Sequence, residues 1–353
     1  MSNLEADPDD VVCDEGSARS IPAPARAMLA APAAGPVELL EPRDVPLGGP
    51  RAMEVRRTLP QRARSLIGAW CFVDHYGPDL VARTHGMVVP PHPHTGLQTV
   101  SWLFAGEIEH RDSTGAHAMV RPGELNLMTA GRGIQHSEVS TTETTVLHGA
   151  QLWVALPDSD RHTSPFFEHY APVPFRHEGA TVHVFVGTLL GDSSPATTFS
   201  PLVGAQLDIP AHTTVRIPVE AAFEHGILVD SGMLHADGAP IPVNTLGYLF
   251  PGRESLLLEA GDEPVRALLI GGAPLGESIV MWWNFIGRSH EEIVAYRTQW
   301  QAEMFGEIPA ATSDSSAPPP GGMPPGRFGH VEGYPGPALP APVLPNVRLR
   351  PRD

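Results

Sequence analysis

Two short motifs, His92-Pro-His94 and His136-Ser-Glu138, constrain the fold of this 353-residue chain more than any other feature. In each motif, two potential metal ligands are separated by one residue, and a β-strand points residues with that spacing to the same face. Two such strands lying side by side in a small barrel would direct three imidazoles and one carboxylate to one point inside it. The motifs therefore predict a metal site with His92, His94, His136 and Glu138 as ligands.

The predicted ligands are borderline in softness and include no thiolate, which suits a divalent first-row transition metal. Iron(II) is the first choice if coordination positions stay open for substrate and oxygen, and Mn, Ni, Cu and Zn are the alternatives. The chain contains 17 histidines, so four unrelated polar residues are the competing interpretation. The glycine-punctuated sequence around both motifs favours the metal site, because Gly131 and Gly133 suit a tight turn before His136.

Residues 37 to about 288 consist of short β-type runs separated by Gly, Pro and Asp. The clearest runs are residues 97–104, 181–186, 213–217, 222–229 and 267–270. Many short strands with frequent turn signals favour antiparallel sandwiches or barrels over a parallel sheet.

One helix is predicted, at residues 290–304. Ser289 and Glu292 have the spacing of a capping box at its start. Apolar residues then recur at helical spacing, which indicates a face packed against the core. They are Ile293, Tyr296, Trp300 and Met304.

Residues 60–78, 92–100 and 128–138 closely resemble the pirin family of bicupins. Residues 269–277 are similar to the segment that closes the second barrel of that family. Cupins in general share the first metal motif. The segment Met-Thr-Ala-Gly-Arg-Gly that precedes His-x-Glu is characteristic of pirins. The resemblance runs from about residue 37 to about residue 305, and the tail from Gly326 also looks like a family tail.

The resemblance, together with the strand pattern, implies an all-β fold of two tandem cupin barrels (double-stranded β-helices, or jelly rolls) with a C-terminal helix and an extended tail. We expect an N-terminal metal-binding cupin domain at residues 37–165 and a C-terminal cupin domain with a closing helix at residues 180–305. Proline-rich composition predicts a flexible leader at 1–36 and a linker at 306–325. Residues 326–353 carry scattered apolar anchors and are expected to pack on the body as an extended tail.

Only the first barrel is expected to hold metal. Histidines in the second barrel have no partner His or Glu at cupin spacing and are interpreted as structural or surface residues; they are His183, His212, His225 and His235. In the first barrel, Gln98 stands where many cupins have a glutamate ligand. We expect Gln98 to support a ligand by hydrogen bonding rather than to bind metal itself.

The resemblance implies a quercetin 2,3-dioxygenase-like oxidoreductase, which cleaves flavonols with O2 and releases carbon monoxide. Its partners would be a flavonoid-like small molecule and O2, and Glu138 would act as general base on the 3-hydroxyl of the flavonol. The alternative function is a non-enzymatic, iron-dependent regulator with a protein partner, either a transcription factor or a metabolic enzyme. A metal that only stiffens the barrel is a third alternative.

Charge and composition limit the other function classes. With 23 basic and 40 acidic residues the formal charge is −17, which opposes direct nucleic-acid binding. A candidate basic patch is interpreted as a solvated strand face; it comprises Arg51, Arg56, Arg57, Arg62 and Arg64. No apolar window is long enough for a membrane helix. Two cysteines and an acidic start without a signal peptide favour the cytoplasm.

Overall fold

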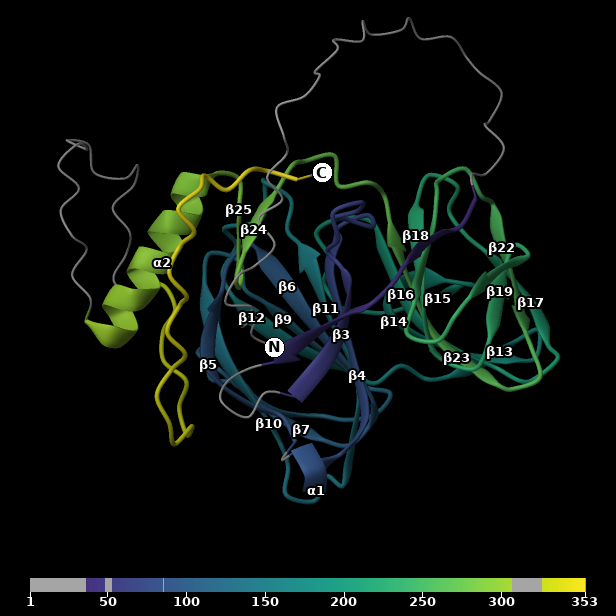
Figure 1. Cartoon of the computed structure of the whole chain (residues 1–353), viewed down its shortest axis with the longest axis horizontal. Helices are drawn as coiled ribbons and strands as arrows, with labels where there is room; N and C mark the ends of the chain where they lie inside the picture. The colour runs from purple at the N-terminus through teal and green to yellow at the C-terminus, as the bar shows by residue number, and fades with distance from the viewer. Residues whose placement is uncertain (1–35, 48–52, 85, 307–325, 353) are drawn as a thin grey trace, which may run out of the picture.

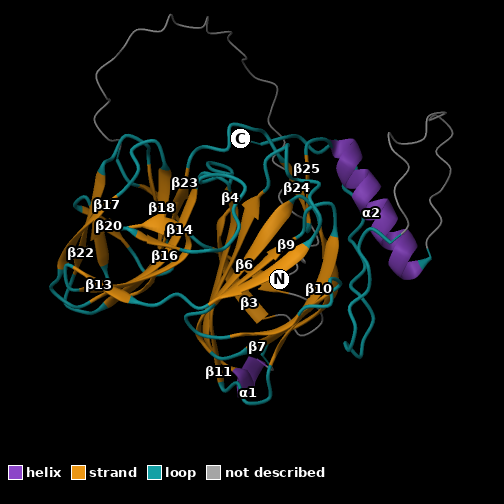
Figure 2. Ribbon diagram, turned by 180° about the vertical axis from the view of Figure 1, so that it is seen from behind, coloured by secondary structure: helices purple, strands orange, loops and turns teal. Residues whose placement is uncertain are grey.

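The computed structural model of the protein describes residues 36–47, 53–84, 86–306 and 326–352. Antiparallel strands form two barrels that lie side by side (Figure 1). A helix and the C-terminal tail lie beside the first barrel, on the side away from the second (Figures 1 and 2). The predicted all-β fold of two cupin barrels is therefore confirmed.

The first barrel pairs a seven-stranded sheet with a four-stranded sheet. The larger sheet has the order β12 (Phe166–Tyr170), β9 (Leu125–Thr129), β6 (Leu97–Ala105), β11 (Val146–Ala155), β4 (Trp70–Leu80), β3 (Met53–Leu59) and β2 (Arg43–Leu47). The smaller sheet has the order β5 (Val88–His94), β10 (Ile134–Ser140), β7 (Ile108–Asp112) and β8 (His117–Val120). A short helix, α1 (Val81–Thr84), follows β4. Both ligand motifs lie in the smaller sheet, on β5 and β10.

The second barrel repeats this plan with an eight-stranded and a four-stranded sheet. The larger sheet has the order β1 (Glu38–Leu40), β21 (Leu246–Leu249), β18 (Glu224–Ser231), β23 (Val265–Gly272), β16 (Leu202–Ile209), β14 (Ala180–Leu189) and β13 (Phe175–His177), with β15 (Asp192–Ser193) on β14. The smaller sheet has the order β17 (Thr214–Pro218), β22 (Ser255–Ala260), β19 (Leu234–Ala236) and β20 (Ala239–Ile241). The predicted strands are confirmed as β6, β14, β17, β18 and β23.

The first described strand, β1, pairs with the second barrel rather than the first. Glu38 lies opposite Tyr248 and Leu40 opposite Leu246. The predicted unit of residues 37–165 therefore contributes a strand to its neighbour, so the predicted domain bounds remain a proposal.

The two large sheets pack face to face between the barrels. Val100 and Trp102 of the first barrel and Leu228 and Leu268 of the second belong to one buried apolar cluster. The indole nitrogen of Trp102 donates to Gln206 Oε1 at 2.8 Å across this interface. Strands such as β6 and β18 are buried on both faces, because one face lines a barrel and the other faces the second barrel.

The C-terminal helix α2 (His290–Phe305) follows the hairpin of β24 (Val280–Trp282) and β25 (Phe285–Gly287). Ser289 is its N-cap and accepts a hydrogen bond from the Glu292 backbone, as the capping box predicted. The helix packs on this hairpin, which reaches the first barrel through a bridge between Thr95 and Phe285. The expected closing helix thus lies against the first barrel, because its apolar face matches the aromatic hairpin. No helix in the described part of the chain is long and apolar enough to span a membrane.

The tail lies along α2 as an extended segment (Figure 1). Phe328 and Val331 are buried, Leu339 N donates to Pro91 O at 2.8 Å, and Arg352 forms a bridge with Ile279. The expected leader and linker fall almost wholly on residues 1–35 and 307–325, which lie outside the described residues.

The candidate basic patch is not a single solvated face. Arg57 is 1% exposed and forms a bidentate ion pair with Asp74 at 2.7 and 2.9 Å. Its guanidinium lies over the Phe72 ring. Arg64 pairs with Glu38 at 2.8 Å. The patch interpretation was wrong for Arg57, because the side chain points into the barrel, where its charge is compensated.

Candidate metal centre

The two ligand motifs meet across the pairing of β5 with β10. His92 lies directly opposite His136, and His94 lies opposite Ile134. A β-bulge shifts the register between His136 and Glu138. On its other edge β10 pairs with β7, where Glu138 lies opposite His110. Three neighbouring strands therefore direct potential ligands into the first barrel.

The three predicted histidines converge. Their ligand nitrogens all lie within 4.8 Å of one another, and the three side chains are fully buried. The Nε2 atoms of His94 and His136 face each other at 3.1 Å. His92 and His136 have ring centroids 4.3 Å apart.

Glu138 belongs to an overlapping group. Its carboxylate lies within 4.8 Å of ligand nitrogens of His136 and His110. Ser101 Oγ, on β6, lies 3.4 Å from Glu138 Oε1 and donates to Gln151 Oε1 at 2.9 Å. Burial and the charge of Glu138 raise the pKa of nearby Tyr76 well above its ordinary value, so this phenol stays protonated.

His110 and Asp112 are site residues that the sequence reasoning missed. His110 Nδ1 lies 3.4 Å from His136 Nδ1, and His110 Nε2 lies 3.2 Å from Asp112 Oδ2. The other Asp112 oxygen accepts from Thr114 N at 2.8 Å. The available signal was a third pair of potential ligands with one residue between its members, His110-Arg-Asp112.

Gln98 does not have the expected supporting role. Its amide nitrogen donates to Thr129 Oγ1 at 2.9 Å and to Thr197 O at 3.0 Å. Gln98 lies on the same face of β6 as Val100 and Trp102, which pack between the barrels. Ser101, on the opposite face of this strand, is the residue that reaches a predicted ligand.

The electrostatic environment keeps the three predicted histidine ligands neutral. Burial lowers the pKa values of His92, His94 and His136 well below their ordinary value. A metal binds only an unprotonated imidazole nitrogen. Because desolvation keeps these side chains neutral near pH 7, they are in the protonation state that binding requires.

The tautomer of His92 fits metal binding. The ring atom Nδ1 donates to Pro90 O at 2.8 Å, which leaves the lone pair on Nε2. That Nε2 atom is buried and has no hydrogen-bond partner among the described residues. A ring nitrogen with a free lone pair, next to two more imidazoles, is a donor arrangement that suits a first-row metal.

The turn before His136 requires glycine, as the sequence predicted. Gly131 has φ +50°, and a Cβ there would lie 2.1 Å from Thr163 O. The turn also brings Gly96 N within 2.8 Å of Gly131 O, which ties the end of β5 to the start of β10. The close approach of these two segments aligns the ligand-bearing strands.

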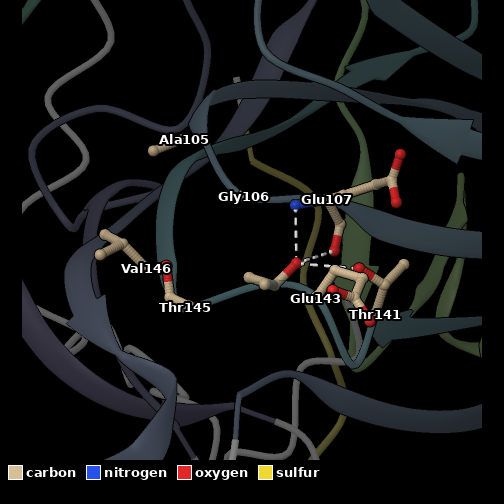
Figure 3. Close-up of a pocket in the computed structure, with 8 residues that line it drawn as sticks. Ala105, Gly106, Glu107, Thr141, Glu143, Thr145 and Val146 are labelled. Atoms are coloured by element: carbon tan, nitrogen blue, oxygen red, sulfur yellow. Dashed lines mark hydrogen bonds between the residues drawn. The ribbon is translucent and has the colours of Figure 1, made fainter.

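A surface pocket of about 290 Å3 lies at the turn between β6 and β7 (Figure 3). Thr144, one of its lining residues, donates to Glu107 O at 2.9 Å and accepts from Glu107 N at 3.0 Å. None of its eight lining residues is a predicted ligand. We interpret this pocket as a structural feature of the loop.

Comparisons with known proteins show which family this chain resembles. The Pirin family model matches residues 52–154, and the Pirin C-terminal cupin domain matches residues 204–306. A Pseudomonas aeruginosa protein, provisionally named a quercetin 2,3-dioxygenase, is 39% identical over 346 residues, which cover 98% of each chain. A pirin-like protein of Caulobacter vibrioides is 34% identical over 262 residues, or 70% of this chain and 88% of that one.

A solved structure shows the same arrangement of barrels. The crystal structure of a quercetin 2,3-dioxygenase from Acinetobacter baumannii superposes with a TM-score of 0.79 at 36% identity. The superposition covers 89% of this chain and 97% of that chain. Two family models in tandem and a relative matched over almost its whole length leave one conclusion: this chain belongs to the pirin family of bicupins.

Proposed function

We propose that this chain is a metal-dependent dioxygenase that cleaves flavonols of the quercetin type. The observation that carries the proposal is the convergence of three buried, neutral imidazoles beside the Glu138 carboxylate inside the first barrel. The names of relatives that are 36% and 39% identical support this choice of substrate and reaction. The proposed ligands are His92, His94, His136 and Glu138, with one divalent metal, iron(II) first.

Glu138 is the proposed general base. Its carboxylate would take the proton of the flavonol 3-hydroxyl, a role that typically contributes about 10²–10⁴-fold to rate. Ser101 Oγ lies 2.9 Å from Gln151 Oε1 and 3.4 Å from Glu138 Oε1, so its one proton can turn to either oxygen. When bound, the metal would supply the redox chemistry with O2 that cleavage requires.

The second candidate function is iron-dependent regulation. All four proposed ligands are 0% exposed, so a change in the charge of the iron would act through the surrounding protein. A regulator would transmit that change to a protein partner, whereas an oxygenase must admit substrate to the same enclosed region.

Oxygen uptake tests the proposal. Protein purified without oxygen and loaded with iron(II) should consume O2 when a flavonol is added, and His94→Ala should not. His169→Ala, at a half-exposed imidazole on β12, is the matched control and should keep the wild-type rate. Fully loaded wild-type protein that consumes no O2 with any flavonol in a panel would support the regulatory function instead.

A further inference from the structure

A second cluster of potential ligands lies between the two barrels. His75 on β4 and His148 on β11 belong to the first barrel, whereas Asp230 on β18 belongs to the second. Their ligand atoms lie within 4.8 Å of one another. The side chains of His75 and Asp230 are each 1% exposed, and that of His148 is 12% exposed. The cluster shares no residue with the candidate metal centre.

Both imidazoles approach the same carboxylate oxygen. His75 Nε2 lies 2.7 Å from Asp230 Oδ1, and His148 Nε2 lies 2.5 Å from the same atom. The second contact is not aligned as a hydrogen bond, and Asp230 Oδ2 has no hydrogen-bond partner among the described residues. Buried polar atoms are normally satisfied, so the close approach of His148 Nε2 to Asp230 without a hydrogen bond points to a shared ligand.

We propose that His75, His148 and Asp230 bind a second divalent cation, of the zinc class, at the interface between the barrels. Two imidazole nitrogens and one carboxylate oxygen are donors that suit zinc, and water can complete the shell on the partly exposed side of His148. The cation would join β4 and β11 of the first barrel to β18 of the second.

The surrounding charges set the expected affinity. Burial lowers the pKa of His75, which keeps its imidazole neutral, and binding the cation would require the tautomer with its lone pair on Nε2. Two arginines would repel a bound cation. Arg266 Nη1 lies 3.5 Å from Asp230 Oδ2, and Arg56 Nη2 lies 3.4 Å from His75 Nδ1. Arg266 is also 3.6 Å from Asp208, a carboxylate toward which it can shift when Asp230 binds the cation. We therefore expect weaker binding here than at the candidate metal centre.

Zinc titration of chelator-treated protein tests the site by stoichiometry. Wild-type protein should bind two equivalents, His94→Ala and His148→Gln one each, and the double variant none. His183→Gln is the matched control and should keep two equivalents, because His183 is a half-buried imidazole 3.7 Å from Asp208 with no third ligand among the residues that the structure describes.

The zinc affinity of Arg266→Gln distinguishes a metal site from a purely structural hydrogen-bond network, which would bind no second zinc equivalent. Removing this cation should tighten the second zinc equivalent about tenfold, because its repulsion acts at close range. A single equivalent in wild-type protein, or unchanged affinity in Arg266→Gln, overturns the proposed site. Either result leaves zinc binding at the candidate metal centre and flavonol-dependent oxygen uptake unaffected, so the two proposals fail separately.

Discussion

His92 and His136 lie directly opposite each other on β5 and β10, with ring centroids 4.3 Å apart. A register shift between β5 and β10 places Glu138 opposite Val89 on β5, while the regular pairing of β10 with β7 places Glu138 opposite His110. The candidate metal centre is therefore built by three strands, although the sequence motifs lie on only two.

Replacing His94 by alanine should remove the metal from the candidate metal centre. The substitution deletes one of three converging nitrogens. The two imidazoles that remain are not enough to hold the ion tightly. Metal analysis after anaerobic purification should show the loss of one equivalent, whereas His169→Ala should lose none. Full metal content in His94→Ala would disprove the ligand assignment.

Replacing Glu138 by glutamine should separate metal binding from catalysis. The amide can still offer an oxygen to iron but cannot take the proton of the substrate, so turnover per iron should fall about 10²–10⁴-fold. Iron content and flavonol-dependent oxygen uptake should be measured on the same samples. Undiminished turnover per iron would remove the general-base role from Glu138 and leave the oxygenase proposal standing.

His225 should make the protein less stable in mild acid. Burial lowers its pKa from 6.5 to about 4, and neither ring nitrogen has a hydrogen-bond partner among the described residues. At a pH between these two pKa values, His225 is protonated in the unfolded chain and neutral in the folded one. The free energy of unfolding therefore falls as the pH drops from 6.5 towards 4. The loss from pH 7 to pH 5 should be about 2 kcal/mol.

Urea unfolding of His225→Leu at the two pH values checks this. The variant should lose stability between pH 7 and pH 5 by about 2 kcal/mol less than wild type does. His212→Asn, at an exposed position, should keep the wild-type pH dependence. An identical pH dependence in His225→Leu would show that another group takes up the proton.

Phe328 should anchor the tail to the body of the protein. Its ring is fully buried, 5.3 Å from that of Trp300 and 6.0 Å from that of Phe285. Phe328→Ala should lower the free energy of unfolding by about 3 to 5 kcal/mol, because it leaves a cavity among these rings. Val343→Ala, at a side chain that is 85% exposed, should change it by no more than about 0.5 kcal/mol. Equal effects of the two substitutions in thermal unfolding would contradict the anchor.

The local features of this protein could be predicted from the sequence. Strand spacing placed His92 beside His94 and His136 near Glu138, and the apolar periodicity located α2 with its cap at Ser289. These features depend on residues a few positions apart, whose relative directions are fixed by backbone geometry.

Features that depend on distant segments were not predictable in this way. His110 belongs to the site because β7 pairs with β10. Gln98 lies outside the site because its face of β6 packs on the second barrel. Nothing near either residue in the sequence records those pairings.

By itself, the sequence predicted the main strand and helix segments, the spacing that points the side chains of each ligand motif to one face and, through resemblance, the family. Only the tertiary structure decided that β1 joins the second barrel, that α2 and the tail cover the first, and that His75 and His148 meet Asp230. The physical reason is that side-chain direction along a strand is a local property of the backbone. Which surfaces meet depends instead on how whole sheets bury their apolar faces against one another.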